Sequence, residues 1–421
     1  MTSRPQALSI NFKRLQNDLN ELAKIGRRGD DPGIYRMAFT EEDMVARDWL
    51  IGKMKAAGIP YRVDGAANLI GHWPPDNQRP AVLMGSHMDT VPCGGHLDGS
   101  LGVLAALEVL RCLIETGREY HYPAAMISFT DEEGRFGGMF GSQSFAGLTT
   151  PETILTSMDL DGVRLEDMMK RRGFDPMEAL DARRDPKTVK CYLELHIEQG
   201  PVLDEGKIPV GIVENITGLF RWSAVLSGKP NHAGTTPMPM RKDAFQGLAE
   251  FANSIPRIVE ENGGEDSRAT IGNVTLLPGS ANTIPGRVEF SLDVRDTSAD
   301  TLEELRDAFR KALSAIARRR GLHFEFEEVS DIEPVHCSDR IVETIAGECE
   351  RLELEARRMP SGAAHDAQVI ATMAPVGMIF VPSKGGQSHS PAEWTAWHDI
   401  EAGVNLALNT MARLCSKEEE D

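Results

Sequence analysis

A short apolar run at residues 81–84 leads directly into a glycine-rich segment, residues 85–102, that carries two histidines and two aspartates. The run predicts a buried strand that delivers His87 and Asp89 to a loop at its carboxyl end. Side chains two positions apart on an extended segment point the same way, which suits a metal ligand and the acceptor that fixes its tautomer. The glycines around Asp98 allow a tight turn. Our first hypothesis is that His87 and Asp98 bind metal; the alternative is a polar turn in which His87 only forms hydrogen bonds.

Polar motifs also follow three further apolar stretches. One of these motifs contains two adjacent acids, Glu132 and Glu133. Two neighbouring carboxylates repel each other unless a positive group lies beside them, and the common alternative is a pair on the solvated surface. Because adjacent side chains on an extended segment diverge, one acid can bind metal while the other faces a bound water. Several strand ends with ligand chemistry predict one shared site. The candidates are Glu132 and Glu133 after a strand at 124–130, His196 after a strand at 191–195, and His389 after a strand at 376–381.

The alternation of apolar stretches with helical periodicity indicates an α/β layer structure whose loops gather at one sheet edge. The segment 151–189 is charged and is expected to be helical with irregular connections. The remaining expected helices lie at 12–27, 41–57, from 101 onward, near 340–352, after His365 and Asp366, and at 399–415, and further strands at 61–64 and 67–72.

From about residue 215 the expected order changes to strand, helix, two strands, helix and strand, at 219–226, 241–258, 268–277, 288–295, 301–320 and 322–328. This order is typical of the ferredoxin-like split unit. A chain of 421 residues exceeds what one core usually accommodates. We therefore predict a catalytic domain at 1–214 and 331–421 with an inserted domain at 215–330. Within the insert, His232 lies in a Gly/Pro-rich loop, and Arg295 lies among acids with which it could simply be ion-paired.

The formal net charge of -19 argues against nucleic acid or an anionic membrane as a partner. It says little about the substrate, because a metal site can invert the local field. Six cysteines without CxxC spacing indicate a reducing compartment, and Cys93, in the loop between His87 and Asp98, is expected to be an incidental small residue. Residues 1–5 lack an apolar leader, and no apolar run is long enough to span a membrane. We predict a cytoplasmic protein.

Seven motifs connect these observations to a known family: SHMDTVP, GGHLDGSLG, DEEGRF, HIEQGPVL, NHAGTTPM, SGAAHDAQ and SHSPAEWT. In this order they resemble the dinuclear-metal amidohydrolases of the M20 metallopeptidase group, in particular the hydantoinase/carbamoylase branch. That branch contains N-carbamoyl-L-amino-acid hydrolases, β-ureidopropionases and allantoate amidohydrolases. The resemblance covers nearly the whole chain. It implies a metallopeptidase-like α/β catalytic domain with an inserted ferredoxin-like α+β domain that acts as a lid and forms a homodimer.

The resemblance also implies a ligand set. Asp98 would bridge two divalent ions, which would be zinc, or alternatively manganese, cobalt or nickel. His87 and His196 would complete one metal site, and Glu133 and His389 the other. Peptidases of the wider group usually have an acid where this chain has His196.

Roles in catalysis follow from the same resemblance. Glu132 corresponds to the general base, and Asp89 to the partner that orients His87. The positions that would bind the substrate carboxylate or the oxyanion are Gln199, His232, Asn282 and Arg295. The sequence leaves open whether His232 acts in its own subunit or across the dimer.

Three positions depart from the family pattern or add to it. Ala364 replaces a usual glycine, and Leu97 stands where an aromatic residue is common, so the substrate assignment is weaker than the metal assignment. His96, beside Asp98, is expected to be a solvent-facing turn residue.

Two divalent cations held by two carboxylates and a bridging hydroxide would leave a net charge of about +1, from about +4 against about -3, which favours an anionic substrate. Such a pair lowers the pKa of its water toward about 7. Glu132 could take a proton from this water and pass it to the departing nitrogen. Arg295 offers a planar fork to a carboxylate, and His232 a donor to the oxyanion. Because both lie on the insert, closure of the lid would assemble the site.

The leading hypothesis is hydrolysis of an N-carbamoyl-L-amino acid to the free amino acid, ammonia and carbon dioxide. Allantoate or another ureido acid is the nearest alternative substrate. A third hypothesis is a dipeptidase or N-acyl amino acid hydrolase, and the HIEQG motif with Gln199, Asn282 and Arg295 counts against it. A fourth hypothesis is a metal-free binding protein on the same scaffold, and the complete ligand set counts against it.

Overall fold

The computed structural model describes residues 7–417, so the N-terminal residues 1–5 considered above lie outside the described part. The chain divides into two compact units. The first comprises the described residues up to Glu214, then Cys337–Met359 and the chain from His365 onward. The second comprises Asn215–His336 and Pro360–Ala364, and is therefore longer than the predicted range 215–330.

The middle of the first unit's sheet consists of parallel strands in the order β16-β7-β5-β6. Antiparallel strands β8 and β4 flank them, and β3 lies beyond β4. Short strands β14 (Val335–His336) and β15 (Ala356–Ser361) pair with β8. The bounds of the others are Tyr61–Val63 for β3, Leu69–Trp73 for β4, Ala81–His87 for β5, Ala124–Phe129 for β6, Val189–Ile197 for β7, Val210–Ile216 for β8 and Val376–Val381 for β16.

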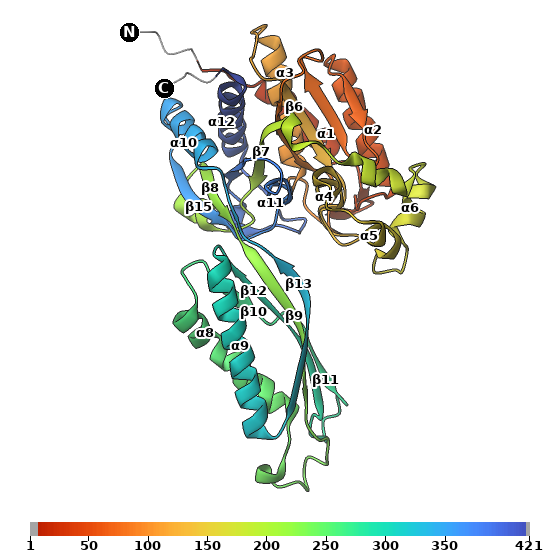
Figure 1. Cartoon of the computed structure of the whole chain (residues 1–421), viewed down its shortest axis with the longest axis vertical. Coiled ribbons are helices and arrows are strands. Elements are labelled where there is room, and N and C mark those ends of the chain that lie inside the picture. Colours follow the sequence, from red (N-terminus) through yellow and green to blue (C-terminus); the bar gives the residue numbers. More distant parts are fainter. Residues whose placement is uncertain (1–6, 418–421) are drawn as a thin grey trace. The chain divides into compact units, whose positions relative to one another are not determined.

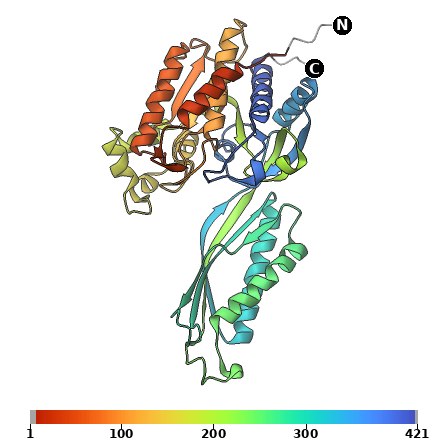
Figure 2. The same ribbon diagram turned by 180° about the vertical axis from the view of Figure 1, so that it is seen from behind.

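Helices cover both faces of this sheet, as the two opposite views show (Figures 1 and 2). The parallel strands are accordingly buried along almost their whole length. The central helix α3 (Ser100–Glu115) packs on β5, β6 and β7 and is buried from Ser100 to Leu113. The other helices of this unit are α1 (Phe12–Leu22), α2 (Glu41–Ala56), α4 (Phe140–Ala146), α5 (Pro151–Thr156), α6 (Leu165–Arg171), α7 (Val202–Gly206), α10 (Asp339–Arg351), α11 (Asp366–Ile370) and α12 (Trp397–Cys415).

The predicted α/β class is confirmed, and several element ends differ from expectation. The first helix stops at Leu22 rather than 27, because the chain turns through Gly26 at φ +97° into the short strand β1 (Arg27–Arg28), which pairs with β2 (Asp31–Ile34). Strand β7 runs to Ile197, so His196 lies within the strand and not after it. Strands β8 and β15 were not predicted from the sequence.

The second unit has an antiparallel sheet in the order β10-β12-β9-β13, with β11 also paired to β12. This is the arrangement expected of a ferredoxin-like split unit. Buried residues at alternate positions of β12 pack with α8 and α9, which lie side by side on one face of the sheet (Figure 1). The elements are β9 (Gly218–Ser227), α8 (Ala244–Asn262), β10 (Arg268–Thr270), β11 (Val274–Leu277), β12 (Arg287–Asp296), α9 (Ala299–Arg320) and β13 (His323–Ile332).

Two predictions for this unit were wrong in detail. The strand expected at 268–277 is two strands, β10 and β11, separated by a break around Gly272. The helix expected at 241–258 is shifted toward 244–262, because the side chain of Asp243 accepts a hydrogen bond from the backbone N–H of Gln246 and caps the helix there. Pro256 lies inside the helix without ending it.

All six cysteines lie in the described part of the chain and are free thiols. Within residues 7–417 we find no helix whose length and apolar character would let it cross a lipid bilayer.

Candidate metal centre

The segments that carry the predicted ligands meet at the carboxyl edge of the parallel strands. His87 is the last residue of β5, and His196 lies at the end of β7. Glu132 and Glu133 follow β6, and His389 lies in the loop after β16. Parallel strands end at the same edge of a sheet, so these side chains come together although they are far apart in sequence.

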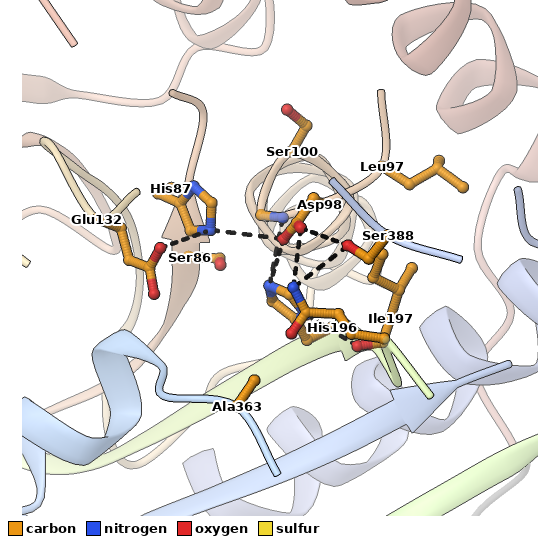
Figure 3. A network of polar contacts seen from close by, with 12 residues as sticks. Ser86, His87, Leu97, Asp98, Ser100, Glu132, His196, Ile197, Ala363 and Ser388 are labelled. Carbon is orange, nitrogen blue, oxygen red and sulfur yellow. Dashed lines mark hydrogen bonds and ion pairs between the residues drawn. The ribbon is translucent and has the colours of Figure 1, made fainter. Parts of the chain in front are cut away.

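Asp98 lies at the centre of the cluster and is almost fully buried, with 4% of its surface exposed. Its Oδ1 atom is 3.2 Å from Nε2 of His196 and 3.8 Å from Nε2 of His87. Figure 3 shows Asp98 between these two imidazoles, with Ser388 on its other oxygen. This half of the cluster is the predicted first metal site.

The second oxygen of Asp98 faces a different pair of groups. Its Oδ2 atom is 3.3 Å from Nε2 of His389, and the same nitrogen is 3.4 Å from Oε2 of Glu133. The His389 side chain is half exposed, so this side of the cluster is open to solvent. One carboxylate thus presents one oxygen to each of two groups, which is the arrangement required of a bridging ligand.

The tautomers of the two buried histidines fit metal binding. Nδ1 of His87 is 3.0 Å from the carbonyl oxygen of Asp89, and Nδ1 of His196 is 2.9 Å from that of Ile197. A carbonyl only accepts, so each Nδ1 carries a proton, and in the neutral form of each ring the lone pair of Nε2 is directed toward Asp98. A lone pair that faces a carboxylate in a buried position requires a proton or a cation between them.

The pKa values express the same requirement. Burial acts to lower the pKa of His196, yet its contact with Asp98 outweighs burial and raises that pKa to about 9. Burial would raise the pKa of Asp98, but His196 and His389 hold it well below its ordinary value. These two shifts reflect a preference for positive charge at Nε2 of His196, whereas burial lowers the pKa of His87, whose Nε2 is 3.8 Å from Asp98.

Glu132 lies beside the first group, with Oε2 3.4 Å from Nε2 of His87 (Figure 3). Burial, assisted by the charges of Asp366 and Glu133, raises the pKa of Glu132 well above its ordinary value. Burial and the charge of Asp98 do the same for Glu133. Adjacent buried acids of this kind are expected where cations or transferable protons are held.

Asp89 differs from its predicted role in one respect. It was expected to orient His87 through its carboxylate, but that carboxylate lies 3.9 Å from Nδ1 and the backbone carbonyl takes its place. The carboxylate instead accepts the backbone N–H groups of Glu132 and Glu133, at 3.4 and 3.1 Å. Asp89 therefore fixes the loop that carries both glutamates.

Two further residues shape the loops around the cluster. Gly99 has φ +60°, and a Cβ atom there would overlap the imidazole of His87, so only glycine fits. Arg36 is fully buried and donates to the carbonyl oxygen of Met88 at 2.7 Å and to Oγ of Ser100 at 2.8 Å. It holds Met88, the residue after His87, and Ser100, at the start of α3 close to Asp98, in fixed positions.

Gln199 was predicted to bind substrate, and its side chain lies on the bridging aspartate. Nε2 donates to Oδ2 of Asp98 at 2.9 Å and to Oγ of Ser388 at 3.3 Å. Its Oε1 atom is buried without a hydrogen-bond partner, so an acceptor is left for a further donor. The residue has φ +58°, a strained conformation for a non-glycine residue.

The remaining predicted substrate-binding residues belong to the second unit. Nδ1 of His232 accepts the N–H of Gly234 at 3.1 Å, which leaves the Nε2 proton of the neutral ring for donation. Oδ1 of Asn282 accepts from Ser280 at 2.8 Å. Nε of Arg295 is 2.9 Å from Oδ1 of Asp293, so the ion pair considered from the sequence is present, and its Nη1 donates to the carbonyl oxygen of Gly362.

One ligand-like group was missed. Glu194, His196 and His365 are fully buried and could also hold a metal ion, and the rings of His196 and His365 are 4.5 Å apart. Burial and the neighbouring His196 lower the pKa of His365 well below its ordinary value. The available signal was the acid two residues before His196 on the same face of β7, together with the histidine of SGAAHDAQ.

His96 and Cys93 are not ligands in any of these groups. His96 was expected to face solvent, but it is partly buried beside Trp394, and this burial lowers its pKa to about 4. Cys93 lies 3.8 Å from Oδ1 of Asp31, in a contact away from the cluster. The interpretation of Cys93 as an incidental residue stays a prediction.

Known proteins with related sequences and structures point to one family. The model for peptidase family M20/M25/M40 matches residues 83–413. The chain is 40% identical over 413 residues to an N-carbamoyl-L-amino acid amidohydrolase of Geobacillus stearothermophilus, across 97% of this chain and 100% of that protein. It is 35% identical over 390 residues to an allantoate amidohydrolase of Escherichia coli, across 90% and 93%. A crystal structure of a hydantoinase/carbamoylase family amidase from Burkholderia multivorans is similar at a TM-score of 0.89 and 35% identity, across 97% and 99%.

The chain therefore belongs to peptidase family M20/M25/M40. The resemblance to the hydantoinase/carbamoylase branch is confirmed, and so is the prediction of a hydrolase that acts on non-peptide C–N bonds. The family generally depends on two metal ions, and the donor set around Asp98 fits such a pair.

The pKa shifts of Glu132, Glu133 and His196 predict how pH affects the stability of the protein after its metal has been removed. Folding raises the pKa of Glu132 and Glu133, so the folded state binds more protons and the free energy of unfolding falls as pH rises. His196 acts in the same direction, because its stabilising proton is lost as pH rises through about 9. The lowered pKa values of His87, His96 and His365 act in the opposite direction, but only below the ordinary histidine pKa of about 6.5. The lowered pKa of Asp98 affects stability only in more acidic solution, below the ordinary aspartate pKa.

We expect urea unfolding of chelator-treated protein to show stability that declines between about pH 7 and 9, where the shifts of Glu132, Glu133 and His196 are not opposed by the buried neutral histidines. Zinc-loaded protein is the control and should decline less. Stripped protein whose stability is constant or increases over this range would contradict the assignment of these shifts.

Proposed function

We propose that the protein hydrolyses the carbamoyl C–N bond of an N-carbamoyl-L-amino acid, and yields the amino acid, ammonia and carbon dioxide. The observation that carries this proposal is the two-sided Asp98, with His87 and His196 near one oxygen and His389 near the other. The amidohydrolase of Geobacillus stearothermophilus, at 40% identity over nearly all of both chains, supports the substrate class.

We assign His87, Asp98 and His196 to one divalent ion and Asp98, Glu133 and His389 to the other, with zinc, manganese, cobalt or nickel as candidates. Bound at these residues, two such ions would lower the pKa of a water molecule toward about 7 and polarise the substrate carbonyl. Two carboxylates do not neutralise two divalent cations, so the site would favour an anionic substrate.

Glu132 is proposed to move the protons of the reaction. Its Oε2 atom lies at the first group of ligands, where it can accept a proton from the attacking water and then donate it to the departing nitrogen. The raised pKa of Glu132 suits a group that must hold this proton between the two steps. The carbonyl carbon gains the oxygen of water as one C–N bond breaks, which gives an amine and a carbamic acid. Loss of carbon dioxide from the carbamic acid breaks the second C–N bond and moves its proton to nitrogen, so one water molecule accounts for the amino acid, ammonia and carbon dioxide.

Substrate binding is assigned to Gln199, His232, Asn282 and Arg295. The planar guanidinium of Arg295 can bind a carboxylate with two parallel hydrogen bonds, which requires exchange of its present contact with Asp293. The Nε2 proton of His232 is suited to an oxyanion. The unpartnered Oε1 atom of Gln199 can accept an N–H of the ureido group.

Allantoate is the second candidate substrate, because allantoate amidohydrolases of Escherichia coli and Bacillus subtilis are 35% and 34% identical to this chain. The same ligands and Glu132 would serve either reaction.

A substrate panel on metal-reconstituted protein separates the two. We expect release of ammonia from N-carbamoyl-L-amino acids and much less from allantoate, with loss of activity on exhaustive chelation and recovery on addition of Zn²⁺, Mn²⁺, Co²⁺ or Ni²⁺. Preference for allantoate would replace the leading substrate assignment. Activity that persists after complete removal of metal would contradict the mechanism.

Replacing Glu132 tests the proton-transfer role. Glu132→Gln should lower kcat by about 10² to 10⁴-fold with metal content unchanged, because the amide cannot accept the proton of water. The readouts are steady-state kinetics and metal analysis, with the exposed Glu119→Gln as the matched control. A Glu132→Gln enzyme with normal kcat would remove this residue from the mechanism.

We also propose that two chains associate through the inserted unit and that the enzyme is cytoplasmic. Apolar residues exposed on β11 and β13, namely Val274, Leu277, Phe326 and Val329, support association through this unit. Light scattering during size-exclusion chromatography should give twice the chain mass, and a monomer at micromolar concentration would refute the dimer.

The six free thiols support the reducing compartment on which the proposal of a cytoplasmic enzyme rests.

A further inference from the structure

Glu393 is a buried acid close to the proposed metal centre to which the proposed mechanism gives no role. Only 2% of its surface is exposed. Its Oε1 atom accepts the backbone N–H groups of Leu97 at 2.8 Å and Asp98 at 3.0 Å. These two contacts join segments that are almost 300 residues apart in sequence, and they fix the backbone that carries the bridging aspartate.

Gly95, which shortly precedes Asp98 in the sequence, makes room for this carboxylate. A Cβ atom on Gly95 would overlap the carboxylate of Glu393. Gly95 is thus required by the close approach of Glu393 and not by its own backbone conformation, because its φ is not in the left-handed region.

Ser388 completes a connection between Glu393 and Asp98. Its Oγ atom is 2.8 Å from Oδ2 of Asp98 and 3.2 Å from Oε2 of Glu393. It also accepts from Nε2 of Gln199 at 3.3 Å. The hydroxyl of Ser388 has one proton to donate, so the carboxylates of Asp98 and Glu393 share that proton. The hydroxyl oxygen accepts the hydrogen bond from Gln199.

Ser388 and Glu393 lie in the same loop as His389, one before it and one after it in the sequence. The loop that supplies the histidine of the second site therefore also holds the aspartate oxygen that faces that histidine. Groups of this kind orient metal ligands, and their loss typically costs about 10 to 100-fold in metal affinity.

We propose that Glu393 and Ser388 are positioning residues that set the spacing between Oδ2 of Asp98 and His389, and thereby the affinity of the second metal site. This rests on the ligand assignment of the proposed function. Glu393 itself binds no metal in this scheme, because backbone donors and Ser388 occupy its oxygens. The first site, at Oδ1 of Asp98, depends on these residues less.

The test is a metal titration of chelator-stripped protein with Zn²⁺ by calorimetry, together with the visible spectrum of the Co²⁺ form. For Ser388→Ala and Glu393→Ala we expect the second equivalent to bind about 10 to 100-fold more weakly and the first to be nearly unchanged. Glu393→Gln should recover part of the affinity, since its amide oxygen can still accept from Leu97 and Asp98. Glu401→Gln, an exposed position on α12, is the control and should bind as the wild type.

The outcomes separate this proposal from the one on which it rests. Wild-type protein that binds fewer than two equivalents would overturn the ligand assignment. Wild-type binding of two equivalents with unchanged affinity in Ser388→Ala and Glu393→Ala would overturn the positioning role alone, as would equal weakening of both equivalents. If Glu393→Ala does not fold, Ser388→Ala removes only a hydroxyl group and decides the question.

Discussion

A buried carboxylate faced by imidazole lone pairs is the interaction on which this site depends. Backbone carbonyls accept hydrogen bonds from Nδ1 of His87 and His196, so Nε2 of each ring faces Asp98, where it needs a proton or a cation. Such an arrangement is unfavourable unless positive charge lies between the groups. The nearby acids Glu132 and Glu133 increase the need for positive charge at this site, because burial opposes their ionisation as well. The arrangement of side chains at this sheet edge is therefore one that bound cations would stabilise.

Much of this could be predicted from local sequence. The run at 81–84 and the apolar stretches before Glu132, His196 and His389 identify parallel strands, and parallel strands bring their carboxyl ends together. Fold class and the convergence of five ligand candidates follow from that rule. The order of elements in the insert likewise predicts its sheet, because the split unit has few alternative topologies.

The parts that were missed depend on contacts between distant segments, for which local sequence has no signal. Whether Asp89 orients His87 through its carboxylate or its carbonyl is decided by how the loop of Glu132 and Glu133 packs against it. The contacts of Gln199 with Asp98, and of Glu393 with residue 97, are also set by tertiary packing. Helix and strand ends were wrong where one residue decides them, as at Gly26 and Asp243. The ion pair of Arg295 was foreseen as an alternative to substrate binding, and its presence in the structure does not exclude exchange for a carboxylate ligand.

The spacing of the ligand candidates along the chain, from His87 to His389, has a consequence for assembly. In an extended chain these side chains are separated by long loops, whose closure costs entropy. The ions would thus be captured late, by a sheet that is already formed, and would have almost no affinity for the denatured ensemble. By thermodynamic linkage they would favour the native state, by about 2.7 kcal/mol when free metal is 100 times its dissociation constant. The supply of metal in the cell would then influence how long each molecule persists as well as how fast it works.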